Sequence, residues 1–131
     1  MEGAAYEVFA QAVRGGGMRH YHALDSRITK GVRLLVEGYC ADYPRRKRIS
    51  ECKYRTITTD EEVMRFREIN AKIDEALSVV DEGMRPFLLT DIANGNGYDR
   101  SMASPFMHRD TYYKQKNEVI LRIALSMHLI L

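Results

Sequence analysis

The sequence has no tryptophan and only two cysteines, Cys40 and Cys52, among its 131 residues. Two cysteines are too few for a disulfide framework, which indicates reduced thiols in a cytoplasmic protein. No stretch approaches the roughly 18 consecutive apolar residues that a membrane span needs. The opening residues, M-E-G-A-A-Y-E, also lack the basic start and apolar run of a signal peptide. We therefore expect a cytoplasmic chain with no membrane partner.

Residue groups that would carry enzymatic chemistry are lacking as well. No set of histidines, cysteines or carboxylates has the spacing of metal ligands, and His20 and His22 would point to different sides of a helix. The sequence N-G-N-G at 94–97 lacks the lysine and the preceding strand of a phosphate-binding loop. The sequence thus predicts neither an enzyme nor a cofactor.

The net charge is only +2, but the charges are unevenly distributed along the chain. Residues 44–59 hold six basic side chains and one acidic one, whereas residues 60–82 hold three basic and eight acidic ones. Alternating blocks of this kind indicate a surface for a polyanion and a second surface for a protein, or for the basic block itself.

Helical periodicity is present along most of the chain, with 45% hydrophobic residues to build a core. A first helix is predicted over Ala4–Val13 and ends at three glycines, residues 15–17, because glycine costs about 1 kcal/mol per position in a helix. A second helix is predicted over Met18–Ala41 and is closed by Pro44. Its expected apolar stripe comprises Tyr21, Leu24, Ile28, Val32, Leu35 and Tyr39.

Four consecutive cations follow Pro44, namely Arg45, Arg46, Lys47 and Arg48. A run this short is usually a solvated loop or helix start. It can also contact phosphates, which release counterions from DNA when they are neutralised. Both interpretations remain open at this point. Residues 52–58 then predict an extended connector, because a single strand would have no partner.

A third helix is predicted to start at Thr59, because T-D-E-E at 59–62 fits a capping box, and to end at Gly83. Its apolar stripe, which suits the stripe of the second helix, comprises Phe66, Ile69, Ile73, Leu77 and Val80. The sequence therefore predicts a long helical hairpin within residues 1–83. A hairpin buries only one seam, so we expect a homodimer or a protein partner on its remaining surface.

Residues 84–131 have the element order of a helix-turn-helix module. Pro86 opens a short apolar helix up to Asn94. A turn, a brief helix over Tyr98–Ala103 and a second turn lead to a long helix over Met107–Ile130. The predicted fold class is all-α, with a long helical hairpin packed on a C-terminal helix-turn-helix module.

The long helix has two different halves. Beyond Glu118 its apolar residues recur at helical steps and predict a buried face. Its first turns are polar and basic, as in a helix that enters a DNA major groove. The predicted DNA contacts, in addition to the basic run, are Arg100, His108, Arg109, Thr111, Tyr112, Lys114, Gln115 and Lys116.

Different contacts suit different parts of DNA. Arg109 and Gln115 suit base edges, whereas Lys114, Lys116 and Arg100 suit backbone phosphates. Tyr112 is assigned to the groove and Tyr113 to packing. Arg109 and Lys116 fall on the same side of the helix as the apolar stripe, so they reach DNA only if the first turns overhang the core.

The residues from Tyr98 to Ala124 carry a resemblance to a known family. They read Y-D-R-S-M-A-S-P-F-M-H-R-D-T-Y-Y-K-Q-K-N-E-V-I-L-R-I-A, with a basic residue before T-Y-Y, basic positions after it, and His108 where the family often has a serine N-cap. This stretch resembles the C-terminal region of the ArpU/RinA type of phage transcriptional regulators, itself similar to region 4 of sigma factors. The resemblance implies an activator of phage or prophage genes that binds double-stranded DNA, with RNA polymerase as a further partner, in a bacterial host cell.

The competing hypothesis is a helical interaction module without direct DNA contact. In that case the two long stripes form a bundle that binds another protein, such as RNA polymerase or a repressor, and the last helix only completes the core. DNA binding that weakens steeply with salt distinguishes the two hypotheses.

Overall fold

The computed structural model describes residues 24–52 and 58–131, and every regular element in these two ranges is helical. The α-helices are α1 (Lys30–Ala41), α2 (Tyr43–Glu51), α3 (Asp60–Leu77), α4 (Arg85–Asn94) and α5 (Arg109–Ser126). Two single 3-10 turns, η1 (Glu82–Met84) and η2 (Tyr98–Arg100), flank α4. The all-α class is thus confirmed. No helix in the described ranges is long and apolar enough to cross a membrane, and the predicted helix over Ala4–Val13 lies outside these ranges.

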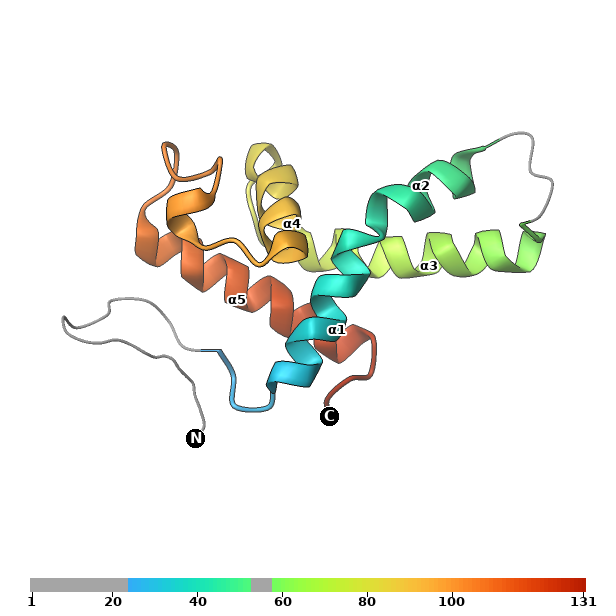
Figure 1. Ribbon diagram of the computed structural model, residues 1–131, viewed down its shortest axis with the longest axis horizontal. Coiled ribbons are helices and arrows are strands. Elements are labelled where there is room, and N and C mark those ends of the chain that lie inside the picture. Colours follow the sequence, from blue (N-terminus) through green and yellow to red (C-terminus); the bar gives the residue numbers. More distant parts are fainter. Residues whose placement is uncertain (1–23, 53–57) are drawn as a thin grey trace.

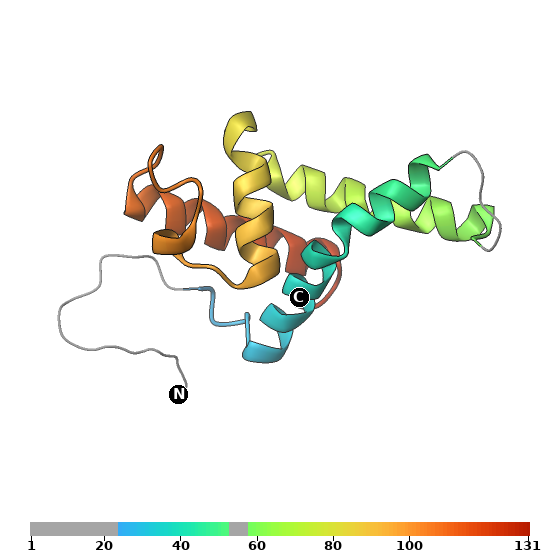
Figure 2. The same ribbon diagram turned by 45° about the horizontal axis from the view of Figure 1, so that its top comes forward.

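The helices form a body and an arm (Figure 1). In the body, α1 packs on α4 and α5, and α3 joins them against α5. The arm consists of α2 and the part of α3 that pairs with it, and both views show it extending away from the body (Figures 1 and 2). The largest fully buried side chains of the body are Val36, Ile73, Val80, Leu88, Ile92, Tyr112, Val119 and Ile123.

Helix α1 begins at Lys30, not near residue 18 as predicted, and residues 18–23 lie outside the described ranges. The cause is a local turn. Asp25 accepts hydrogen bonds from the backbone N–H and the guanidinium of Arg27, an arrangement that competes with helix formation. The side chain of Thr29 then accepts the N–H of Val32 (3.2 Å) and caps the helix.

The predicted pairing of the second and third helices is wrong. The partner of α3 is the short basic helix α2, and α1 packs instead on α4. Pro44 does not end the helical path, because it lies in the first turn of α2, where its missing N–H costs nothing. The buried face of α1 shifts accordingly, so Val36 and Cys40 are buried while Leu35 is 54% exposed.

Later elements follow the sequence more closely. The capping box of α3 is present in full, with Thr59 and Glu62 bonding each other's backbone N–H. However, α3 ends at Leu77 with Ser78 as its cap, and Gly83 belongs to η1. Gly95 ends α4 in the left-handed conformation (φ 68°), as a C-terminal glycine favours. The division of the chain at residue 83 stays a prediction, since the core of the body contains residues from both sides of it.

Candidate nucleic-acid interface

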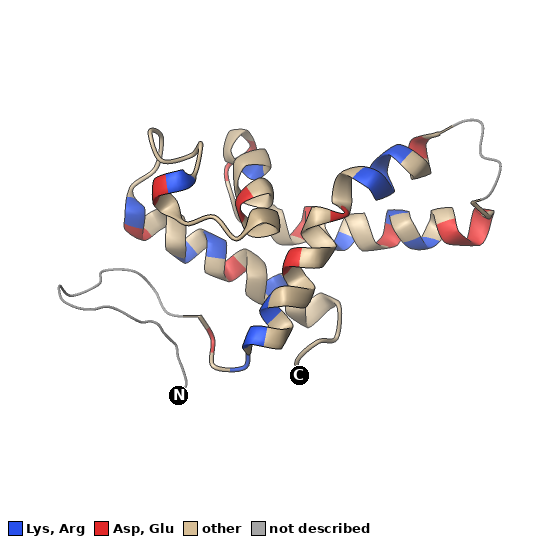
Figure 3. Cartoon of the chain, in the orientation of Figure 1, with Lys and Arg blue, Asp and Glu red and all other residues tan. Residues whose placement is uncertain are grey.

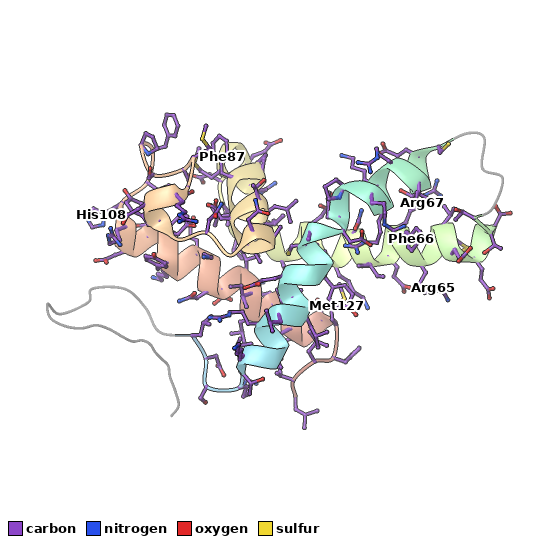
Figure 4. The ribbon with its side chains drawn as sticks, in the orientation of Figure 1. Arg65, Phe66, Arg67, Phe87, His108 and Met127 are labelled. Carbon is purple, nitrogen blue, oxygen red and sulfur yellow. The ribbon has the colours of Figure 1, made fainter. Side chains whose placement is uncertain are left out.

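The N-terminal end of α5 lies at the opposite end of the molecule from the arm (Figures 1 and 4). His108 caps this end, because its Nδ1 accepts the backbone N–H of Asp110 (3.3 Å). Asp110 also places a carboxylate in the first turn, where the helix dipole favours it. Arg109, Thr111 and Lys114 are exposed on the first two turns. Three of the predicted contacts are therefore accessible on one short stretch of helix, which we call the α5 tip.

Arg109 joins the α5 tip to η2. Its guanidinium forms an ion pair with Asp99 (2.8 Å) and lies 5.0 Å from the centre of the Tyr98 ring. Arg100, the next residue of η2, is exposed as well. The ion pair is open to solvent, and exposed pairs are typically worth less than about 1 kcal/mol. A phosphate or a guanine edge can therefore replace Asp99 as the partner of Arg109 at little cost.

Three tyrosines fix the segment 98–108 onto α5. The rings of Tyr98 and Tyr112 are 5.4 Å apart, those of Tyr112 and Tyr113 are 5.1 Å apart, and both contacts are edge-to-face. The hydroxyl of Tyr98 donates to the carbonyl oxygen of Met107 (2.6 Å), and the backbone N–H of Tyr98 donates to the hydroxyl of Tyr113 (3.1 Å). The segment that leads into the α5 tip is thus fixed to α5 by these contacts.

Tyr112 is fully buried, so the prediction that it faces the groove is wrong. Its hydroxyl donates to Asp91 of α4 (2.9 Å), which is 2% exposed. Burial, together with this hydrogen bond, raises the pKa of Tyr112 and keeps it protonated. Tyr112 is consequently an anchor between α4 and α5. Tyr113 is half-buried and packs beside it.

Lys116 and Gln115 also turn toward the body. The ammonium of Lys116 donates to the carbonyl oxygen of Asn96 and lies over the rings of Tyr112 and Tyr113, at 5.7 and 5.9 Å. Burial lowers the pKa of Lys116. The Oε1 atom of Gln115 is buried and has no hydrogen-bond partner within the described residues. Lys116 is therefore occupied inside the fold, which corrects its assignment to DNA, and the acceptor of Gln115 faces inward.

The basic run lies on α2, and its four members have different surroundings. Arg46 is 3% exposed. It donates to Asn70 of α3 (2.8 Å) and to the carbonyl oxygen of Tyr39, so its assignment to DNA is wrong. Arg45 pairs with Asp42 (2.6 Å) and lies 5.4 Å from the ring of Phe66. Lys47 and Arg48 are exposed. Arg45 and Arg46 thus take part in the packing of α2 on α3. Of this run, only Lys47 and Arg48 face outward without an ion pair among the described residues.

The two basic regions predicted from the sequence are not brought together. Lys and Arg residues of α2 lie on the arm, whereas those of η2 and the α5 tip lie at the far end of the long axis (Figure 3). A single short DNA duplex therefore cannot contact both regions at once. The α5 tip and the arm are two separate candidate DNA-binding sites.

The sequence did not predict that two apolar side chains are exposed in the segment that precedes the α5 tip. Met102 and Phe106 are each 70% exposed in the segment between η2 and α5, although Ala103 between them is fully buried. Nothing in their spacing distinguishes them from residues of an ordinary turn. The only local signal is Pro105, which breaks the helical pattern before Phe106.

Among residues 24–52 and 58–131, no group of three or more histidines, cysteines or carboxylates is placed to hold a metal ion. Cys40 is buried, and burial raises the pKa of its thiol to about 12, while no disulfide joins it to Cys52. Comparison with known proteins found no matching family, no similar curated protein and no similar solved structure.

Proposed function

We propose that the protein is a sequence-specific DNA-binding regulator of transcription that presents the α5 tip to a major groove. The observation that carries the proposal is the division of the first turns of α5 into two faces. Arg109, Thr111 and Lys114 are exposed, whereas Tyr112 and Lys116 are bonded to α4 and the turn after it. A contact set on a helix fixed in this way is preorganised for recognition.

The exposed side chains have distinct roles. Arg109 can bond the two acceptors of a guanine, and the methyl group of Thr111 can contact the methyl group of a thymine. Lys114 and Arg100 suit phosphates, which position the helix without reading sequence. The finer proposal, an activator of phage or prophage genes in a bacterial host cell that also contacts RNA polymerase, rests on the resemblance of residues 98–124 alone.

An interaction module without DNA contact is the second candidate. It is favoured by Met102 and Phe106, because both are large apolar side chains that are exposed within one short segment, and exposed apolar surface marks protein contacts. Under this hypothesis the α5 tip supports a protein surface, and its cations pair with acidic residues of the partner.

Selection of bound duplexes from random DNA, followed by titrations between low and moderate salt, tests the proposal. Two cations at phosphates, Lys114 and Arg100, predict a log–log salt slope of roughly −2 per protomer. Lys114→Gln should reduce that slope by about 1 for all sequences, whereas Arg109→Ala should cost about 1–3 kcal/mol and relax one base position.

Arg65→Ala is the matched control, because Arg65 is exposed but lies on the arm (Figure 4). It should change neither affinity nor selectivity. Absence of any binding at low salt would leave the interaction module as the function.

A further inference from the structure

Helix α1 presents an apolar face that no described residue covers. Gly31, Leu34, Leu35, Gly38 and Ala41 recur at helical steps and are all exposed, with Leu34 at 53% and Leu35 at 54%. The opposite side of α1, with Val36 and Cys40, packs into the body. In Figure 1, α1 crosses in front of α3 and α5. These five exposed residues, Gly31, Leu34, Leu35, Gly38 and Ala41, form what we call the α1 face.

Nothing in the described part of the chain requires glycine at the two glycine positions of this face. Neither has a positive φ. A Cβ atom at Gly38 would meet nothing within 4 Å, and one at Gly31 only the hydroxyl of Thr29 at 4.0 Å. Glycine is the least favourable helix residue apart from proline, so its presence twice in a helix of 12 residues needs another reason. Close approach of another backbone is such a reason.

The charges beside the α1 face suit a second copy of the same chain. Lys30 and Glu37 are seven residues apart and therefore lie along the same side of the helix. If two α1 helices run antiparallel, that side of one helix faces the same side of the other, so each lysine approaches the partner's glutamate. Within its own helix Glu37 forms only a long ion pair with Arg33 (3.7 Å), which an additional lysine can share. A parallel arrangement, in contrast, would place these charges opposite Val32 and Tyr39.

We propose that two copies of the protein associate through their α1 faces, antiparallel, about a two-fold axis that passes between Leu34 and Leu35. In this register Leu34 of one copy opposes Leu35 of the other, and Gly31 opposes Gly38, where the backbones approach most closely. Lys30 lies about 3 Å along the axis from the level of Glu37 in the other copy. A two-fold contact of this kind closes on itself and gives a dimer.

The size of the contact predicts a weak dimer. Stable interfaces bury about 1,200–2,000 Å² in total, and one face of a helix of 12 residues offers less than that. We therefore expect dissociation in the micromolar range in solution. Dimerisation through the α1 face does not require DNA, although a dimer on DNA would gain affinity because its two α5 tips bind together.

Sedimentation velocity of the full chain across the micromolar range is the first test. Leu34→Ser with Leu35→Ser removes four half-exposed leucines from the dimer and should weaken association about 100- to 1,000-fold. Met64→Ser is the matched control, because Met64 is 69% exposed on α3 and lies outside the α1 face. It should leave association unchanged.

Gly38→Gln separates loss of the interface from loss of the fold. The space around Gly38 is open, and glutamine is a better helix former, so the midpoint of thermal unfolding should rise where both proteins are monomers. Association should weaken, because the new side chain keeps the two backbones apart. Gly83→Gln is the control, since Gly83 is equally open and lies in η1.

A cysteine crosslink tests the register. In a Cys52→Ser background, Leu35→Cys lies close to its own copy and should form a disulfide-linked dimer under mild oxidation, whereas Met64→Cys should not. A full chain that stays monomeric throughout the concentration range overturns the proposal, and residues 1–23 or a different protein then remain as occupants of the face. Dimerisation that these α1 substitutions leave unchanged overturns it as well.

Discussion

Replacing Tyr112 by phenylalanine removes a single hydroxyl from the interior and tests whether this residue is an anchor. That hydroxyl donates to Asp91 Oδ2 at 2.9 Å, and Asp91 is 2% exposed. Asp91 also accepts a hydrogen bond from the side chain of Asn96, but at 3.5 Å this bond is too long to compensate. Loss of a hydrogen bond to a buried charged group costs about 1.5–3 kcal/mol. For a chain of this size that lowers the midpoint of thermal unfolding by roughly 5–12 °C.

The effect should also depend on pH. Because burial and Asp91 raise the pKa of Tyr112 above its ordinary value of 10.0, the unfolded chain releases this proton first as the pH rises. The stabilisation is therefore fully present below pH 10 and declines above it. Tyr112→Phe should remove this part of the alkaline loss. Tyr43, whose pKa is raised to about 12 mainly by burial, keeps its own share.

Urea unfolding followed by circular dichroism between neutral and alkaline pH measures both effects. Thr111→Val is the control, because Thr111 is the exposed neighbour and its replacement should stay within about 0.5 kcal/mol. Wild-type stability for Tyr112→Phe would refute the anchoring role. Equal DNA affinity of Tyr112→Phe and wild type, in contrast, agrees with it.

Two further substitutions test the packing around the candidate interface. Arg46→Met removes the buried bonds to Asn70 and the Tyr39 carbonyl oxygen and should cost about 2–4 kcal/mol in urea unfolding, whereas exposed Lys47→Met should cost less than about 0.5 kcal/mol. Equal losses would contradict the burial of Arg46. Gly97→Ala brings a Cβ to 3.0 Å from the Tyr113 hydroxyl, which the backbone N–H of Tyr98 holds in place, and should cost about 1 kcal/mol, whereas Gly83→Ala meets nothing within 4 Å and should not destabilise.

The elements that the sequence predicted well are those with local end signals. The capping box at Thr59 and the Pro86–Gly95 pair set helix ends through contacts within a few residues, and the structure contains both. The burial of the apolar half of α5 is also predicted from local sequence, since the spacing of its apolar residues alone defines one face of the helix.

The sequence-based predictions are wrong where contacts between residues far apart in the chain determine the structure. The turn that delays α1 also binds the C-terminus, because Arg27 donates to the carbonyl oxygen of Leu131. Pro44 is compatible with either a break or the first turn of a helix, and packing on α3 selects the second. The register of α1 follows from its contact with α4, which no periodicity within α1 reveals.

The candidate interface shows the same limit. Tyr112 and Tyr113 are adjacent and chemically identical, and the choice between them is made by Asp91 and Asn96, which belong to α4 and the turn after it. Likewise, Asn70 on the facing helix distinguishes Arg46 from the other cations of its run. The set proposed to contact DNA, Arg100, Arg109, Thr111 and Lys114, therefore emerges only from the folded chain.

Amide chemical-shift changes of the full-length protein on addition of duplex DNA at low salt test the central claim most directly. The largest changes should occur at Arg109, Thr111 and Lys114 and in η2, with little change in α2 and the paired part of α3. Changes confined to the arm, or no change at all, would contradict the assignment of DNA recognition to the α5 tip.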